Sequence, residues 1–407
     1  MRKPPCNLRL QGYYFPTCLL SKAYLCVILK HYPILNWVGK AMPNTITNRQ
    51  MFLMLFICIT AVAESDISRV TAQNVGRSGW IAILLTAILF AAAAFLWTKL
   101  NNLHQGKMLF DYSKELVGKA GAYFLALYFT QYFITVLVSL NITMSAILQS
   151  NFLPKTPVWA TSLASLPVIG FVAYKGVTNT ARLVEIYGVI LIVTSIVVHL
   201  IMLMEGDKYF ILPLFNPADT GKILSSVKEF TFSFLGFEVL AVIPFSVKQG
   251  PKTGAIAAIA LLVIGLFYVL IVETNIMMIG VDEIKHYNFP LVVAIRQVEI
   301  PLLKVFQRID VLYLTVGFIG LFGGLSVIYL SIVEFICRML PKIKRSIIVI
   351  AIGVIAILTE TVIYGIEDIN IMLKEIITYS GVFAACLVPL MLYIITKVKN
   401  RGTKKTA

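Results

Sequence analysis

Charged residues are scarce in this sequence. Only 14% of its 407 residues are Asp, Glu, Lys or Arg, and 58% are hydrophobic, whereas soluble domains carry about 25% charged residues. A water-soluble fold has no interior large enough to hide so much apolar surface, so the composition excludes a soluble enzyme, a nucleic-acid-binding module and a disordered chain. The sequence therefore predicts an all-α protein that crosses a lipid bilayer several times and does not bind nucleic acid.

Signals of catalysis and of metal binding are also missing. The sequence contains no phosphate-binding loop, no GxSxG motif and no HExxH motif. Its four histidines and six cysteines are scattered, and the cysteines form no CxxC pair, which argues against a metal site or a disulfide framework. We therefore expect neither an enzyme nor a protein that holds a metal or a cofactor.

Ten apolar segments are candidates for membrane-spanning helices, each of which needs roughly 20 residues. Eight carry at most one acidic residue, and they are Trp80–Trp97, Ala120–Pro154, Thr156–Tyr174, Tyr187–Met204, Thr253–Val272, Val311–Val333, Ser346–Ile366 and Ile376–Thr396. The other two are Gln50–Val70 and Glu229–Val247. Lys and Arg concentrate in every second loop and in the C-terminal tail, so both termini are predicted to be cytoplasmic. The segment Ala120–Pro154 is longer than one bilayer thickness and therefore predicts a long or tilted helix.

The first 41 residues do not fit this pattern. They hold six basic and no acidic residues, and two lysines and a histidine interrupt the stretch Thr17–Val38, which makes it a poor spanning helix. They also lack the order of a signal peptide. We therefore expect a non-conforming extension at 1–41 outside the fold, a ten-span membrane domain at 42–398 that starts at Met42, and a basic cytoplasmic tail at 399–407. The alternative is an extra interfacial helix within the first 41 residues.

The first and sixth spans are interrupted in a way that predicts a binding site. Met51–Ala63 is thirteen apolar residues, about 20 Å of helix, which is too short to cross. In the sixth span Glu238 follows Gly236 and lies ten residues from a lysine on either side, which places it near the bilayer midplane. A charge at that depth costs several kcal/mol unless it faces protein or a watery cavity. Interrupted helices at matching positions of two halves are typical of transporters with an inverted five-plus-five repeat.

Each of these features also has a purely structural explanation. Gly236 could serve close helix packing, and Pro244 could be a tolerated kink. Glu64 and Asp66 could be surface residues that end a short helix. Glu238 could belong to a structural ion pair.

A family resemblance rests on short motifs distributed over 42–398. They are Leu153-Pro-Lys-Thr-Pro-Val-Trp159, Lys175-Gly176, Ala181-Arg-Leu-Val-Glu-Ile186, Phe234-Leu-Gly-Phe-Glu-Val239, Pro244-Phe245 with Lys248, Phe289-Pro290 and Phe306-Gln-Arg-Ile-Asp310. In their order and spacing these motifs resemble the endospore germination permeases, which are the B subunits of spore germinant receptors in the amino acid–polyamine–organocation superfamily. One region differs: that family's first span usually carries a Gly and then a Pro at its break, whereas here it reads Ala61-Val-Ala-Glu-Ser-Asp-Ile-Ser68.

The resemblance implies a LeuT-like fold of ten helices in which helices one and six are discontinuous. It implies a protein of the inner spore membrane that senses a small nutrient, such as an amino acid, and triggers germination together with A-type and C-type receptor subunits. The family's pocket lies among spans one, three, six and eight. The corresponding residues here are Ala63, Glu64, Ser65, Tyr132, Val138, Phe234, Gly236, Phe237, Glu238, Leu325 and Tyr329. The main alternative is a proton- or sodium-coupled amino acid transporter of the same superfamily, and a scaffold without a ligand is the third possibility.

Overall fold

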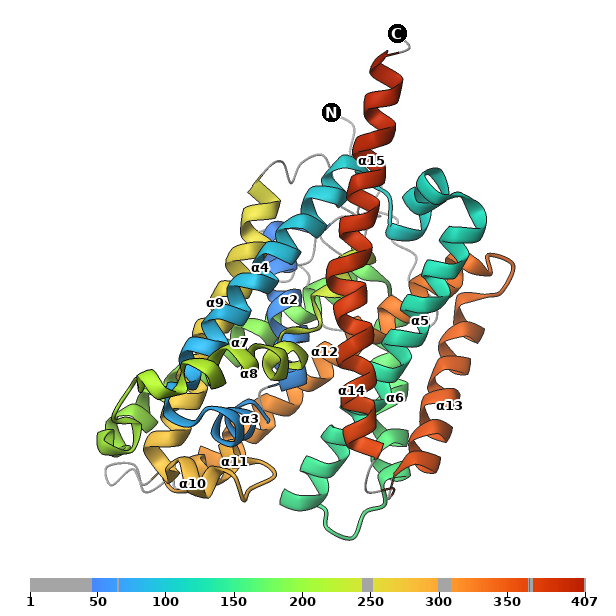
Figure 1. The fold of residues 1–407 in the computed structure, drawn as a ribbon. Helices are drawn as coiled ribbons and strands as arrows, with labels where there is room; N and C mark the ends of the chain where they lie inside the picture. The colour runs from blue at the N-terminus through green and yellow to red at the C-terminus, as the bar shows by residue number, and fades with distance from the viewer. Residues whose placement is uncertain are drawn as a thin grey trace, which may run out of the picture. The chain divides into compact units, whose positions relative to one another are not determined.

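The computed structural model describes residues 46–63, 66–243, 252–298, 309–364, 366 and 369–405. Every element of regular structure in these ranges is helical (Figure 1). The expectations for the segment 1–41, for Glu64 and Ser65 and for the kink at Pro244 concern residues outside the described ones.

Seven helices in the described ranges are long and apolar enough to cross a membrane. The last of them is a run of consecutive helical elements that is counted as one helix. They are α4 (Gly79–Leu103), α5 (Leu109–Asn151), α7 (Val177–Glu205), α9 (Lys252–Ile279), α12 (Ile309–Met339), α13 (Arg345–Ile363) and the run of α14 (Ile369–Val382), a π-helical turn (Phe383–Leu387) and α15 (Val388–Lys405). Two shorter apolar helices are α2 (Asn48–Ala63) and α6 (Val158–Tyr174). The prediction of an all-helical, multi-pass membrane protein is confirmed, and the count of ten spans stays a prediction.

The first and sixth predicted segments, Gln50–Val70 and Glu229–Val247, are interrupted helices. In the first, α2 is followed by α3 (Ile67–Asn74), and Asp66 lies immediately before α3. In the second, α8 (Thr220–Phe234) ends before a 3₁₀ helix, η5 (Phe237–Ala241). Neither segment forms one continuous helix across the bilayer. In each, polar residues interrupt the apolar run, and the apolar stretch that remains is too short to cross.

The predicted segment Ala120–Pro154 does form a long helix. α5 covers Leu109–Asn151 but is kinked at Gly118, whose backbone angles (φ +79°, ψ 175°) are non-helical, so its uninterrupted part runs from Lys119 to Asn151. Glycine tolerates this conformation because it has no Cβ. The prediction of a helix longer than one bilayer thickness is confirmed.

α2 lies inside the helical bundle, where it packs against α7, α8, α9 and α12. Figure 1 shows α4 and α9 running side by side, and α13 beside α5 and α6, in agreement with the contacts between these helices. Small residues allow the helices to approach closely: a Cβ on Gly265 of α9 would lie 2.5 Å from the Cβ of Ala87 in α4. Close approach at small residues is the usual way in which membrane helices pack.

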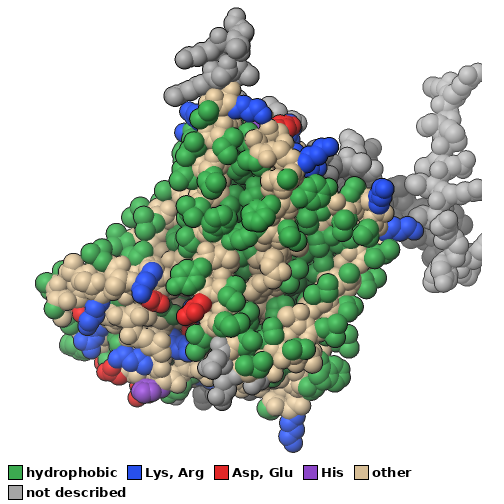
Figure 2. Space-filling view, turned by 45° about the vertical axis from the view of Figure 1, so that its right-hand side comes forward, with side chains coloured by type: hydrophobic (Ala, Val, Ile, Leu, Met, Phe, Trp, Pro, Cys, Tyr) green, Lys and Arg blue, Asp and Glu red, His purple; other side chains and the backbone are tan. Residues whose placement is uncertain are grey.

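The outer surface of the bundle is apolar. Figure 2 shows hydrophobic side chains over the middle of the face in view, with Lys and Arg gathered toward its upper end and charges of both signs toward its lower end. Large apolar side chains such as Leu89, Phe124 and Leu266 are exposed. Lipid tails would cover such a surface, because water would not.

Candidate ligand-binding site

The two interrupted helices meet at Gly236. This residue stands between α8 and η5 with a φ of +120°, which an L side chain rarely adopts. A Cβ at this position would lie 2.9 Å from the carbonyl oxygen of Cys58 and 3.2 Å from the backbone nitrogen of Ile59, both in α2. The glycine is therefore required for its backbone angle and for the direct contact between α2 and the turn that joins α8 to η5.

Tyr268 of α9 joins the same two helices. Its buried hydroxyl lies 3.0 Å from the carbonyl oxygen of Ile59 and 2.9 Å from that of Ser233, and can donate to either. The carbonyl of Ser233 lies in the last turn of α8, where a helix has no internal donors left, and that of Ile59 lies four residues before the end of α2. Tyr268 is not among the residues predicted from the sequence, because a tyrosine in an apolar helix carries no distinct signal.

Glu238 lies at this junction and is 0% exposed. Its Oε2 accepts a hydrogen bond of 2.6 Å from the backbone N–H of Gly236, while Oε1 has no hydrogen-bond partner among the described residues. The side chain of Tyr132, from α5, lies beside the carboxyl group. No Lys or Arg of the described part of the chain pairs with Glu238, so the explanation as a structural ion pair finds no support there. A buried carboxyl oxygen without a partner is unfavourable unless a ligand or a proton reaches it.

The chain beyond Glu238 is held in place by α4 and α5. Asn101 of α4 donates from Nδ2 to the carbonyl oxygen of Leu240 at 2.8 Å, and the hydroxyl of Tyr112 donates to Oδ1 of Asn101 at 3.1 Å. All of these groups are buried. The short helix η5 therefore has a defined position although its own hydrogen bonds are few.

A small cavity adjoins Gly236 between α5, α8 and α14. It has about 240 Å³ of unfilled space, and its lining consists of Tyr132, Val136, Ser139, Leu140, Phe232, Leu235, Gly236 and Ile377. Tyr132 and Gly236, both predicted pocket residues, thus share one cavity.

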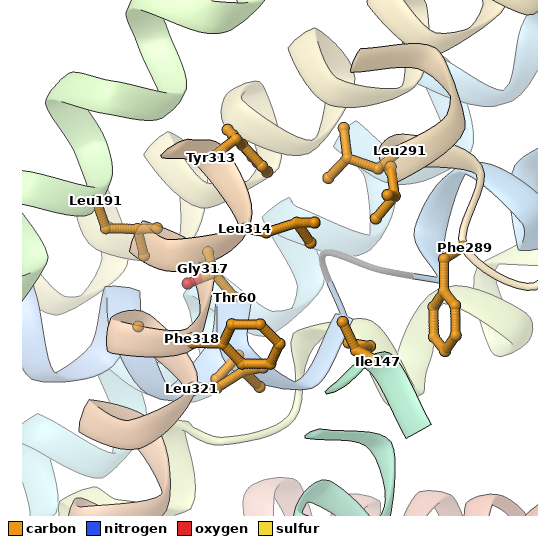
Figure 3. A pocket seen from close by; sticks show the side chains of 13 residues that line it. Thr60, Ile147, Leu191, Phe289, Leu291, Tyr313, Leu314, Gly317, Phe318 and Leu321 are labelled. Carbon is orange, nitrogen blue, oxygen red and sulfur yellow. The ribbon is translucent and has the colours of Figure 1, made fainter. Parts of the chain in front are cut away.

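A larger apolar cavity adjoins the C-terminal end of α2 (Figure 3). It contains about 580 Å³ of space between atoms, part of which is open to the outside. Thr60 and Tyr313 supply its hydroxyl groups, and Figure 3 shows Tyr313 and Leu291 across the cavity from Phe318 and Ile147 in that view. The full lining is Thr60, Ala61, Ile147, Leu191, Phe289, Leu291, Val292, Tyr313, Leu314, Gly317, Phe318, Gly320 and Leu321, from α2, α5, α7, α12, α11 (Pro290–Arg296) and the residue before α11.

None of these lining residues is among the pocket residues predicted from the sequence. Phe289 did belong to the quoted Phe289-Pro290 motif, so one signal for this cavity was present in the sequence. The rest lie in uniformly apolar segments, where no residue stands out.

Among the predicted pocket residues, the structure brings Tyr132, Gly236 and Glu238 together. Phe234 and Phe237 instead pack against Phe90 of α4, with ring centroids 6.1 and 5.8 Å apart. They fill the space between helices and do not line either cavity described above.

The remaining predicted residues lie elsewhere. Val138 is buried in α5 and Leu325 in α12. The hydroxyl of Tyr329 donates to the carbonyl oxygen of Val349 in α13 at 2.6 Å, so this group joins α12 to α13. Ala63 is the last residue of α2.

Asp66 lines neither cavity and forms ion pairs instead. Its carboxylate pairs with Arg69 at 2.6 Å and with Lys374 of α14 at 2.8 Å. These contacts tie the break after α2 to the last apolar run. They agree with the explanation that Asp66 is a structural residue next to a short helix.

Two interrupted helices around a buried carboxylate, inside a bundle of apolar helices, define a membrane protein of the transporter type. Solved transporters share the fold. The structure of MhsT in complex with L-phenylalanine matches with a TM-score of 0.63 at 12% identity, over 84% of this chain and 88% of that one. A substrate-bound Na⁺-coupled sialic acid symporter matches with a TM-score of 0.61 at 10% identity, over 84% of this chain and 77% of that one. At this level of identity the likeness establishes the fold alone.

The family model described as spore germination protein matches residues 45–364, and the chain belongs to this family. Its relatives in Bacillus subtilis (strain 168) include three spore germination proteins. They are YndE (24% identity over 89% of this chain and 99% of the relative), A2 (26% over 54% and 60%) and B2 (24% over 63% and 70%). The resemblance inferred from the motifs is confirmed. Both family and fold are of the permease and transporter type, which at the family level separates the chain from enzymes.

Proposed function

We propose that this chain is the permease-like subunit of a spore germinant receptor, which senses a small nutrient such as an amino acid and triggers germination. The junction of α2, α8 and η5 carries the proposal. Oε1 of Glu238 is buried and has no partner among the described residues, so it is available to a ligand ammonium group.

The apolar cavity supports the same proposal. Its residues Thr60 and Ala61 follow Cys58, which contacts Gly236, by less than one helical turn of α2. A ligand that has both a charged group and an apolar side chain therefore fits this arrangement. The polar groups on one side of α2 suit its charged group, and the apolar cavity at the end of α2 suits its side chain. The similarity to the proteins named A2 and B2 supports a receptor of several subunits, with A-type and C-type partners.

The proposal includes ten spans in an inverted five-plus-five repeat, with α2 and α3 corresponding to α8 and η5. It places the chain in the inner spore membrane with both termini on the cytoplasmic side. The family and the apolar helices support this location.

Reporter fusions test the topology. Fusions within 101–118 and 339–345 are expected to be cytoplasmic, and fusions within 206–224 and 282–300 external, because Lys and Arg are denser in the first pair and acidic residues outnumber them in the second. The measurement is the activity of a reporter that folds on one side of the membrane only. A reversal between two neighbouring loops contradicts the ten-span count.

A germinant screen tests the function. Spores whose only intact receptor contains this chain are exposed to single amino acids and other small nutrients, and loss of refractility is followed. We expect a response to a narrow set of nutrients that disappears when this chain is deleted. Responses that survive the deletion contradict the proposal, and proton- or sodium-dependent uptake by the chain alone in vesicles favours the transporter alternative.

A further inference from the structure

A second buried carboxyl group lies where α13 contacts α5 and α6. Glu360 of α13 is 1% exposed. Its Oε2 accepts hydrogen bonds from Nδ2 of Asn141 at 2.7 Å and from the hydroxyl of Ser162 at 2.6 Å. The hydroxyl of Ser145 lies 3.5 Å from Oε1. In the sequence Glu360 is only the one acidic residue of an apolar segment, and its partners are more than 190 residues away.

No cation pairs with Glu360 within the described ranges. Neither α5, α6 nor α12, the helices packed against α13, directs a charged side chain toward it. The nearby titratable groups have other partners: the hydroxyl of Tyr364 donates to Gln149 of α5, and that of Tyr329 donates to Val349. A buried carboxylate without a counter-charge is expensive, and binding a proton removes that cost.

The hydroxyl groups near Oε1 can serve both protonation states. Ser145 Oγ and Thr161 Oγ1 are 2.7 Å apart and either can donate, and Thr161 Oγ1 lies 2.7 Å from the carbonyl oxygen of Val158. When Glu360 is ionised, Thr161 donates to Ser145 and Ser145 donates to Oε1. When Glu360 is protonated, Oε1 donates to Ser145, Ser145 to Thr161, and Thr161 to the carbonyl of Val158. Reorientation of two hydroxyls thus leaves each of them with a partner in either state.

We propose that Glu360, with Asn141, Ser145, Thr161 and Ser162, is a proton-binding site separate from the Glu238 junction. Glu360 lies three residues before the end of α13, and Thr161 and Ser162 lie in the first turns of α6, so the site is close to one membrane surface. The proton comes from water at that surface and returns to it, and no other bond changes. The contacts of 2.6 and 2.7 Å between the polar atoms leave no space for a metal ion among them.

Infrared titration of the full chain in lipid vesicles tests the proposal without a germinant. We expect the C=O stretch of a protonated, buried carboxyl group to appear as pH falls in the wild type and one such band to be lost in Glu360→Gln. The matched control is Glu283→Gln, which removes an exposed carboxylate from the short helix α10 (Val281–Ile284) and retains the band. Asn141→Ala raises the midpoint of the band by about one pH unit, a tenfold change in proton affinity, because the amide Nδ2 can donate only and so favours the ionised form.

Three outcomes overturn this proposal. One is a titration of Glu360→Gln identical to that of the wild type, and another is an Asn141→Ala variant whose midpoint does not move. The third is a midpoint that sodium shifts at constant pH, which identifies a metal-ion site instead. If Glu360→Gln does not insert into the membrane, the midpoint of Asn141→Ala decides alone. Failure of the germinant screen leaves these results unaffected.

Discussion

Spores that carry Glu238→Gln in this chain need about 10- to 100-fold more germinant for a half-maximal response than wild-type spores, or do not respond. Gln retains the size of Glu and an oxygen that can accept the 2.6 Å bond from the N–H of Gly236, so the variant reaches the membrane in normal amount. It lacks the negative charge that we propose binds a ligand ammonium group, and a hydrogen bond to a charged group contributes about 1.5–3 kcal/mol. Dose–response curves at equal protein level in the membrane measure the effect.

Glu229→Gln is the matched control for this experiment. Glu229 lies nine residues earlier, in α8, and its partly exposed carboxylate is 3.5 Å from Lys228. Exposed ion pairs contribute little, so this variant responds as the wild type does. A wild-type dose–response curve for Glu238→Gln shows that its carboxylate is structural and that the ligand binds elsewhere.

Gly236→Ala destabilises the folded protein by about 3–5 kcal/mol, because the added methyl group has two separate costs. The first part of this cost is the backbone angle of φ +120°. The second is the new Cβ, 2.9 Å from the carbonyl oxygen of Cys58, which is backbone and cannot rotate aside. Thermal unfolding of the detergent-solubilised protein and its amount in the membrane measure the loss.

Gly106→Ala separates the two costs. Gly106 also has a positive φ, +74°, but no atom lies within 4 Å of its added Cβ. Its substitution therefore costs only the backbone strain, about 1 kcal/mol. Equal losses in the two variants show that the contact between Gly236 and α2 is not the cause, and an unaffected Gly236→Ala contradicts the described junction.

The sequence by itself determined the class of protein and its family. Apolar residues in runs near 20 can bury their backbone polar groups in lipid only as helices, so composition and run length sufficed for an all-helical membrane protein. The interruption at Gly236 and Glu238 was also predictable, because a glycine and a charge in an apolar run are local signals. The motifs predicted the family that the comparison confirmed.

Only the tertiary structure decided which side chains meet. Tyr268 reaches Ile59 from 209 residues away, and Asn141 reaches Glu360 from 219. The structure also directs Phe234 and Phe237 toward α4, although they flank Gly236 in the sequence. The physical reason is that lipid is as apolar as the bundle interior, so a membrane helix need not place its hydrophobic residues on one face. Without that periodicity the inward face of each helix is set by packing against its neighbours, and packing is a property of the folded chain.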